Sequence, residues 1–296
     1  MIYSISPEFL VLIAAGIWGT SGVAIHYADL PSGIISFFRM AVPTVVLGTW
    51  FLLRRQRVSW DSLALKLGAS TLNAARMFFF FTAYRLTSVS NAVIALYTWP
   101  IFAVFFARIV LGERVSGRRT ALLLVAFAGV PLLYLPAFFG SVEMYLQDIL
   151  GISSMLVSAA LHGMAIVLLK RARPGKSKFE TTFFQNLVGA VVFLPVLLLS
   201  EVELALYQIG IGLYLGFFVG IVGFTLFFVG LHRASAARVG NLAYFEVVVA
   251  VTLSVLVLRE PLAWNTVAGG CLIVVSVLFS QRGGRREKTR SVGVER

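Results

Sequence analysis

The residues of this chain that could do chemistry are ionisable side chains set within long apolar runs. Glu246 is the one acidic residue well inside such a run, and Arg76 and His162 lie near the middle of two others. A carboxylate can pair with an ammonium group or carry a proton, and a guanidinium or an imidazole can hold a carboxylate. Each has a structural alternative as well, because polar groups in apolar surroundings often bond only to a neighbouring helix.

Aromatic and amide side chains complete the candidate set. An aromatic-lined cavity binds flat apolar molecules through ring stacking and cations through the ring quadrupole, and amides add hydrogen bonds. Tyr97 and Trp99 are separated by about 200° on a continuous helix, so both cannot face one cavity squarely. The residues predicted to bind a small-molecule substrate are Trp18, Asn73, Arg76, Tyr97, Trp99, His162, Asn186, Tyr244 and Glu246.

Other residues of similar type are expected to have structural roles. Arg39 lies close enough to the end of its apolar run to snorkel, and a contact with another helix or the capture of a carboxylate is also open to it. Tyr84 fits the aromatic belt found at membrane interfaces. Gly216, Gly220 and Gly223 offer a small-residue face that favours close packing of helices.

The same residues argue against catalysis. An intramembrane enzyme needs clustered groups such as paired aspartates, a metal-ligand set or a Ser/His pair. No other acidic residue lies well inside an apolar run to form a pair with Glu246, and no two histidines occur at helical spacing. We therefore expect no catalytic residues, no metal site and no cofactor, with an intramembrane enzyme acting on lipid or peptide as the remote alternative.

The composition places these residues in a membrane. Of the 296 residues, 59% are hydrophobic and 13% are charged, with a mean hydropathy of +0.90, whereas soluble domains are about 25% charged. The net charge of +12 does not indicate nucleic-acid binding, because the basic residues lie between apolar runs rather than on one folded face. The single cysteine, Cys271, falls inside an apolar run, which excludes an internal disulfide and predicts a small buried residue.

Apolar runs of roughly 18 to 23 residues recur along the chain, and each is long enough to cross a hydrocarbon core of about 30 Å. Because the runs are continuous rather than alternating, they are expected to be helices and not barrel strands. The sequence therefore predicts an all-α membrane protein with ten transmembrane helices. They are expected at residues 8–27, 33–53, 64–85, 89–111, 119–136, 147–169, 180–199, 206–231, 239–258 and 264–281.

The distribution of basic residues predicts the orientation. Twenty of the 25 Lys and Arg residues lie after even-numbered spans or in the basic tail 282–296, two lie in the other loops, and three lie within spans. Since cytoplasmic loops carry the excess of Lys and Arg, both termini are expected in the cytoplasm. The N-terminus lacks a basic n-region and a small-residue cleavage site, so we expect no cleaved signal peptide.

A repeat relates the two halves of the chain. Shifting the stretch 83–119 by 147 positions superposes Tyr97 on Tyr244 and Glu113 on Glu260. The two glutamates close their apolar runs, and they are expected to cap helix-end contacts at the two membrane surfaces.

The halves 1–136 and 147–281 each hold five expected spans. Five is odd, so the second half must enter the membrane from the opposite side. Two inverted repeats can open a shared site first to one side and then to the other, which predicts transport by alternating access. In the same register Trp99 corresponds to Glu246, and both are expected to point inward.

Several short motifs resemble those of a known family. They are Trp18 followed by glycine in the first span, Arg39 early in the second, Pro100 in the fourth, and Leu-Gly-Glu-Arg at 111–114. Together they resemble the drug/metabolite transporter superfamily, in its EamA branch, and within it the chain is similar to YddG-type aromatic amino acid exporters. In the second half Val247 stands where the family usually has proline, which weakens the transfer of residue roles to that half.

The resemblance implies an integral inner-membrane protein that exports small metabolites, with amino acids including aromatic ones as the expected substrates. We expect a monomer in the lipid bilayer, with no nucleic-acid partner. Two other cargoes stay open, namely amphiphilic drugs or cations and nucleotide-sugar-like metabolites. Proton antiport, exchange and facilitated diffusion are all compatible with the sequence.

Overall fold

The computed structural model describes residues 5–56, 58–112, 117–133, 142–172, 179–233, 242–276 and 279. Within these ranges the chain is helical and contains no strand. This confirms the all-helical class that the continuous apolar runs predict. The basic tail 282–296 lies outside the described residues.

The helices of the first half of the chain follow one another with short connections. They are α1 (Pro7–Gly19), α2 (Ser21–Ala28), α3 (Ser32–Leu53), α4 (Leu63–Leu86), α5 (Val89–Leu96), α6 (Trp99–Leu111), α7 (Gly117–Ala128) and α8 (Val130–Leu133). The second half holds α9 (Val142–Arg171), α10 (Glu180–Leu198), α11 (Leu206–Tyr214), the π-helical segment η3 (Leu215–Gly223), α12 (Phe224–Arg233), α14 (Phe245–Val257) and the helix Trp264–Ser276.

Local chemistry explains several helix boundaries. At the start of α1 the Ser6 hydroxyl accepts a hydrogen bond from the Phe9 N–H, and Pro7 occupies the first helical position, where no N–H is needed. Ser88 caps α5 in the same way by accepting from the Asn91 N–H. Gly112 ends α6 with a φ of 67°, a left-handed conformation that favours glycine.

Six helical segments are long and apolar enough to cross a membrane, which confirms a multi-pass membrane protein. They are Pro7–Ala28, Ser32–Leu53, Val89–Leu111, Leu146–Arg171, Glu180–Leu198 and Leu206–Phe227. Three shorter apolar helices, Thr120–Leu133, Phe245–Val257 and Trp264–Ser276, lie where the sequence predicts further spans. The remaining expected span coincides with α4, which carries Lys66, Arg76 and Arg85 and is therefore less apolar.

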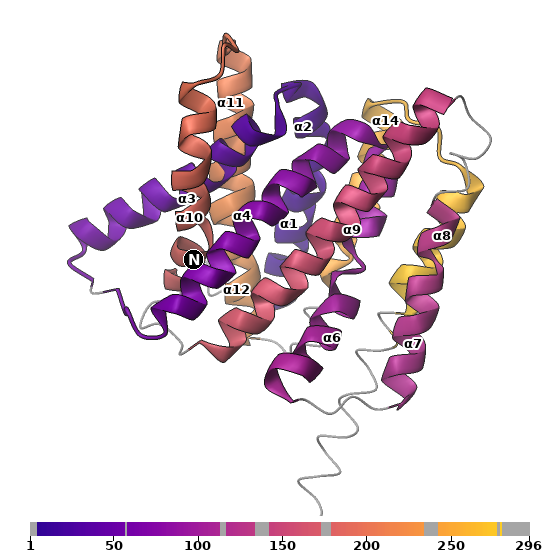
Figure 1. Ribbon diagram of the computed structural model, residues 1–296, viewed down its shortest axis with the longest axis horizontal. Helices are drawn as coiled ribbons and strands as arrows, with labels where there is room; N and C mark the ends of the chain where they lie inside the picture. Colours follow the sequence, from indigo (N-terminus) through magenta and orange to yellow (C-terminus); the bar gives the residue numbers. More distant parts are fainter. Residues whose placement is uncertain are drawn as a thin grey trace, which may run out of the picture.

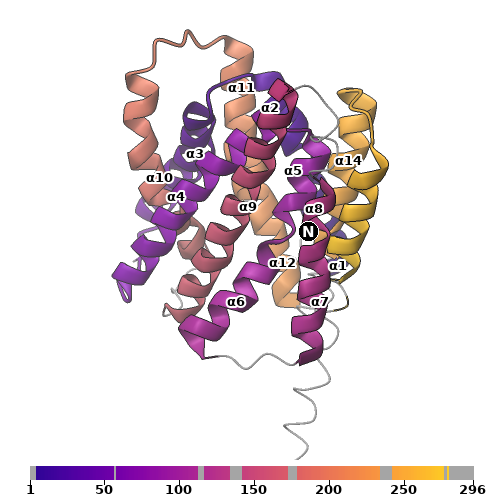
Figure 2. The same cartoon turned by 45° about the vertical axis from the view of Figure 1, so that its right-hand side comes forward.

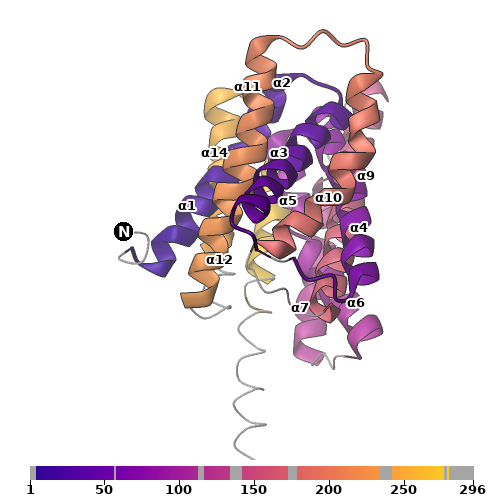
Figure 3. The ribbon, with the colours of Figure 1, turned by 90° about the vertical axis from the view of Figure 1, so that its left-hand side faces the viewer.

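Helices from the two halves of the chain interleave. α4 packs along α9, α3 packs against α10, and α1 packs against α12 and α14 (Figure 1). Figure 2 shows α4 and α9 side by side from a second direction. In Figure 3, α11 and α12 form one column that runs beside α1. Polar residues from both halves can therefore meet in the interior.

The fourth and ninth expected spans are interrupted by turns, the fourth near its middle and the ninth near its start. Tyr97 and Thr98 form a turn between α5 and α6, and Pro100 takes the second position of α6, where a missing N–H is tolerated. Tyr244 forms the corresponding turn in front of α14. Across this turn the two side chains have different partners, since Tyr97 contacts Glu246 and Tyr244 whereas Trp99 contacts His162.

Glycines let α3 approach η3 closely. A Cβ added at Gly216 would lie 2.5 Å from the Cβ of Val42 and 2.7 Å from the carbonyl oxygen of Phe38. A Cβ at Gly220 would lie 2.8 Å from Nη1 of Arg39. These approaches confirm the small-residue face predicted for this span.

Cys271 is exposed on the helix Trp264–Ser276, so the prediction that it is buried was wrong. An apolar run across a membrane has a lipid-facing side as well as a protein-facing side. A thiol behaves as a small apolar group and can occupy either one.

Candidate functional site

The breaks in the fourth and ninth spans meet in the interior and bring together residues of both halves. The Tyr97 hydroxyl lies 2.7 Å from Oε2 of Glu246 and 2.8 Å from the carbonyl oxygen of Ala243, so its hydrogen can be donated to either acceptor. The rings of Tyr97 and Tyr244 lie 4.7 Å apart at an angle of 42°. Three of the predicted site residues thus form one contact cluster, which we call the tyrosine–glutamate cluster: Tyr97, Tyr244 and Glu246.

The cluster contains one polar atom without a partner. Both tyrosines are buried, and the hydroxyl of Tyr244 has no hydrogen-bond partner among the described residues. A buried hydroxyl without a partner costs free energy on the order of 1–3 kcal/mol. The cluster can therefore offer this hydroxyl, together with the Glu246 carboxylate, to a ligand.

Arg76 lies on α4, and neighbouring residues orient its side chain in the interior. Its Nη1 donates to Oδ1 of Asn73 at 3.3 Å, and its guanidinium lies 5.6 Å from the ring centroid of Phe80. The Asn73 amide in turn donates to the carbonyl oxygen of Gln185 on α10 at 2.9 Å. Asn73 therefore uses its hydrogen bonds to join two helices and to orient Arg76.

Arg76 and Glu246 are interior ionisable groups that form no ion pair. In the described part of the chain no carboxylate lies within salt-bridge distance of Arg76, and Glu246 accepts a hydrogen bond from Tyr97 instead. The interior thus keeps an anionic group and a cationic group apart. Such an arrangement is complementary to a molecule that carries both charges.

Trp99 and His162 form a second contact between the halves. Their rings lie 5.2 Å apart in an edge-to-face arrangement at 68°. The backbones of α6 and α9 approach closely beside this pair, because a Cβ at Gly163 would lie 2.6 Å from the backbone nitrogen of Ala103. Nδ1 of His162 is buried and has no partner among the described residues.

Two of the predicted site residues donate to backbone carbonyl oxygens instead. The indole N–H of Trp18 donates to the carbonyl oxygen of Val219 in η3 at 3.2 Å, and its ring lies 4.9 Å from that of Phe224. The Asn186 amide donates to the carbonyl oxygen of Thr182, one turn earlier in α10, at 2.7 Å. Neither side chain contacts the tyrosine–glutamate cluster through a described hydrogen bond or ring contact.

Two residues expected near the membrane surface are buried. Arg39 is 5% exposed and lies 5.6 Å from the ring centroid of Phe224, so it does not snorkel. The absent side chain of Gly220 makes room for its guanidinium. Tyr84 is also 5% exposed, with its ring 4.9 Å from that of Phe80, and does not belong to an exposed belt. Both surface predictions were wrong because neighbouring helices cover these ends of the spans.

Glu260 links the end of the ninth span to the start of α5. Its Oε1 accepts the backbone N–H of Val89 at 3.0 Å, as expected for a glutamate that caps a helix-end contact. Ser90 bonds Ser254 at 2.8 Å beside it. The matching residue of the first half, Glu113, lies outside the described residues.

A cavity of about 270 Å³ lies beside this cap. Its lining includes His26, Arg85, Asp148 and Glu260. These residues come from the ends of the first, third and ninth expected spans and from the start of the sixth.

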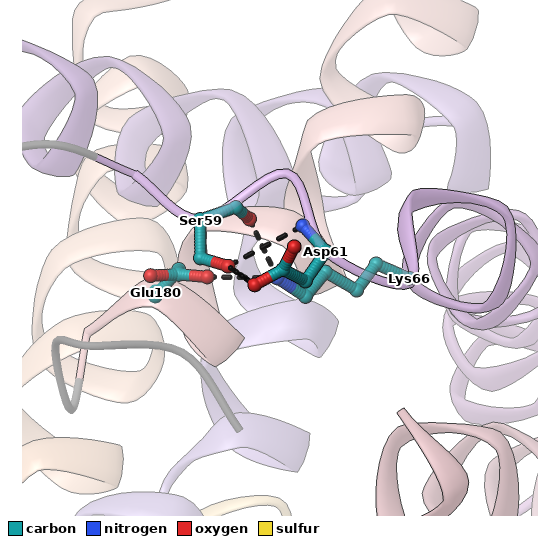
Figure 4. A network of polar contacts seen from close by, with 4 residues as sticks. All are labelled: Ser59, Asp61, Lys66 and Glu180. Atoms are coloured by element: carbon teal, nitrogen blue, oxygen red, sulfur yellow. Dashed lines mark hydrogen bonds and ion pairs between the residues drawn. The ribbon is translucent and has the colours of Figure 1, made fainter. Parts of the chain in front are cut away.

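A buried ion pair fastens the opposite end of α4. Nζ of Lys66 lies 2.8 Å from Oε1 of Glu180 at the start of α10, and it also donates to the carbonyl oxygen of Ser59 at 2.6 Å (Figure 4). The side chains are 6% and 1% exposed. Ser59 and Asp61 hydrogen-bond to each other at 3.0 Å, which stiffens the turn before α4. This network joins the two halves of the chain. No described contact links it to the tyrosine–glutamate cluster.

One buried polar residue on α9, Ser158, was not predicted from the sequence. Ser158 on α9 is fully buried, and its hydroxyl has no partner among the described residues. It lies four residues before His162, a spacing that places both on one face of a helix. That spacing was the available signal, but a single serine in an apolar run carries little weight by itself.

Comparison with known proteins gives one family. The model of the EamA-like transporter family matches residues 5–135 and 149–281. An uncharacterized transporter of Archaeoglobus fulgidus is 27% identical over 73% of this chain and 76% of its own length. The pseudopaline exporter of Pseudomonas aeruginosa is 27% identical over 86% of this chain and 88% of its own. The uncharacterized transporter YwfM of Bacillus subtilis is 26% identical over 97% of this chain and 96% of its own length.

A solved crystal structure has a similar fold. It aligns with a TM-score of 0.61 at 18% sequence identity and covers 93% of this chain and 96% of its own. At this identity the likeness concerns the fold alone.

Proposed function

Because the chain belongs to the EamA-like transporter family, we propose that it exports small metabolites across the inner membrane, with amino acids, including aromatic ones, as its cargo. The family and the named relatives make it a membrane transporter, and no enzymatic role follows from them. The direction of transport is supported by the name of the Pseudomonas relative, which is an exporter. The choice of aromatic amino acids also rests on the resemblance to YddG-type exporters.

The tyrosine–glutamate cluster is the observation that carries the proposal. Tyr97 and Tyr244 present two aromatic rings 4.7 Å apart where two helices break. Glu246, bonded to Tyr97, supplies a carboxylate for an ammonium group. Broken helices near the middle of a membrane are where transporters bind substrates, because the free backbone ends and polar side chains there can be offered to a ligand.

The two-repeat architecture is the proposed basis of alternating access. Exchanging the halves 1–136 and 147–281 maps the contact of α4 with α9 onto that of α12 with α1. It also maps the contact of α10 with α4 onto that of α3 with η3, and the contact of α6 with α9 onto that of α14 with α1. Ten spans in two inverted repeats would have this pattern, since each half then offers the other an equivalent surface.

The proposed orientation has both termini in the cytoplasm. It rests on the excess of Lys and Arg in alternate loops. With this orientation, the span ends that line the cavity beside Glu260 all lie on the outer side.

The test is transport by the purified protein in proteoliposomes. We expect uptake of radiolabelled phenylalanine and of other amino acids in a panel, measured with and without a pH gradient, and little uptake of a cationic dye. Movement of the dye without movement of any amino acid would contradict the proposed cargo and favour an exporter of amphiphilic cations. Accumulation that depends on the pH gradient would identify proton coupling, and transport that the gradient leaves unchanged would indicate exchange or facilitated diffusion.

A further inference from the structure

Three buried hydrogen-bond donors without partners lie on α4 and α9. They are Nε of Arg76, Oγ of Ser158 and Nδ1 of His162, the last in the tautomer that carries its proton there. Arg76 is 7% exposed and Ser158 is fully buried. Each unpaired donor costs free energy on the order of 1–3 kcal/mol, so three together point to a partner that the chain itself does not provide.

Packing of α4 against α9 places the three residues at one level. Near one end of the pair, a Cβ at Gly151 would lie 2.7 Å from Cβ of Thr87, and near the other a Cβ at Gly68 would lie 3.7 Å from Cδ1 of Leu168. The helices are therefore antiparallel, and each step along α4 corresponds to about one step back along α9. Arg76 then lies level with the turn of α9 that holds Ser158 and His162.

Helical periodicity also places Ser158 and His162 on the side of α9 that faces α4. Ser158 follows Gly151 by seven residues, two helical turns, and so lies on the side of α9 that contacts Thr87 at the end of α4. His162 follows Ser158 by one turn on nearly the same side.

The described hydrogen bonds of Arg76 leave its Nε–H group available. Nη1 is committed to Asn73, which is itself fixed to α10 through Gln185. Nε carries a further N–H and has no acceptor among the described residues. Glu246, the interior carboxylate, bonds to Tyr97 instead.

We propose that Arg76, Ser158 and His162 form the carboxylate subsite of the transported molecule, with Ser158 as a residue that determines specificity. The three groups are all donors and one is cationic, which is complementary to the two oxygens and several lone pairs of a carboxylate. The inference rests on the proposed function and names the part of the substrate bound at this end of the site. The ammonium group then faces Glu246 and the unpartnered hydroxyl of Tyr244.

Binding of three matched probes to the purified full-length protein tests this subsite. Phenylalanine carries ring, ammonium and carboxylate, phenylalaninamide lacks the carboxylate, and benzoate lacks the ammonium. We expect the wild type to bind phenylalanine about tenfold more tightly than phenylalaninamide. Ser158→Ala should weaken phenylalanine and benzoate by about tenfold, the effect of losing one hydrogen bond to a charged group, and leave phenylalaninamide unchanged.

Ser36→Ala is the matched control. Ser36 is also fully buried in a spanning helix, but its hydroxyl already donates to the carbonyl oxygen of Ser32 at 2.6 Å. The two variants remove the same atom from similarly buried positions. Ser36→Ala should leave the affinities for all three probes at their wild-type values.

The outcomes separate this inference from the proposed function. If Ser158→Ala weakens phenylalanine and phenylalaninamide equally, or weakens neither, the carboxylate subsite is wrong even if amino acids are transported. If amino acids are not transported but benzoate binds in a Ser158-dependent way, the proposed cargo is wrong and the carboxylate subsite stands. Phenylalanine binding no better than phenylalaninamide would overturn the subsite in either case.

Discussion

The hydroxyl of Tyr97 lies 2.7 Å from Oε2 of Glu246, and this contact joins the break in one half of the chain to the corresponding break in the other. The two residues come from regions that the repeat superposes, although they are not each other's counterparts. A hydrogen bond to a carboxylate in the interior orients it and stabilises its charge. The same contact keeps the aromatic rings of Tyr97 and Tyr244 together.

Removing the hydroxyl of either tyrosine should have opposite consequences for stability. Tyr97→Phe deprives Glu246 of its donor and should lower the free energy of unfolding by about 1–3 kcal/mol. Tyr244→Phe removes a hydroxyl that has no partner among the described residues, so stability should stay the same or rise. Thermal unfolding of the two variants in the same detergent measures the difference, and equal losses would contradict the hydrogen-bond assignment.

The buried ion pair of Lys66 and Glu180 should be costly to break from one side. Lys66→Met leaves the Glu180 carboxylate 1% exposed without a cation, and we expect a loss of about 3–5 kcal/mol of stability. The double change Lys66→Met and Glu180→Leu should recover most of that loss, because no charge is then left unpaired. Arg85→Met, at an exposed position on the same helix, is the control and should change stability by only about 0.5 kcal/mol. A double variant no more stable than the single one would show that the pair stabilises the fold by more than charge compensation.

The close approach of α3 to η3 should not tolerate a methyl group. Gly216→Ala places a Cβ 2.5 Å from Val42 and 2.7 Å from a backbone oxygen that cannot rotate away, so we expect a loss of about 1–3 kcal/mol. Gly16→Ala in α1 meets nothing within 4 Å and should leave stability unchanged or raise it by about 0.5–1 kcal/mol. The unfolding temperatures of the two variants check this contrast. Equal temperatures would mean that the helices separate at little cost.

Periodic and compositional signals predicted the elements of this fold well. Apolar runs bounded by charge, proline or glycine coincide with helices apart from a few short turns within the described residues, because length and hydropathy are properties of one segment. The breaks were harder to predict. Pro100 marked one of them, but the turn at Tyr244 has no proline beside it and follows from the register with Tyr97.

Burial was predicted less well than helicity, since it depends on the neighbouring helix. Arg39 is buried because Gly220 on another helix leaves it space, and Cys271 is exposed although its run is apolar. Tyr84 lies near a span end but is covered by packing. In each case the deciding residue lies far away in the sequence.

The candidate site could be predicted in part for the same reason. Glu246, Arg76 and His162 stand out because ionisable groups are rare in spans. In the structure Glu246 bonds to Tyr97, His162 contacts Trp99, and Arg76 is buried on α4. Trp18 and Asn186 were chosen by the same criterion, yet they bond to η3 and to their own helix. Ser158 was not predicted, because the sequence does not show that α4 packs on α9 there or that the buried Ser158 hydroxyl has no partner among the described residues.

Phenylalanine counterflow in proteoliposomes that contain wild-type protein or Glu246→Gln tests the central claim most directly. Glutamine keeps the size of the side chain and a hydrogen bond to Tyr97 but loses the negative charge that we assign to the ammonium group of the substrate. We predict clear counterflow with the wild type and a rise in KM of at least about tenfold with Glu246→Gln, the loss of one charge-assisted contact. Absence of counterflow with the wild type, or an unchanged KM in Glu246→Gln, would contradict it.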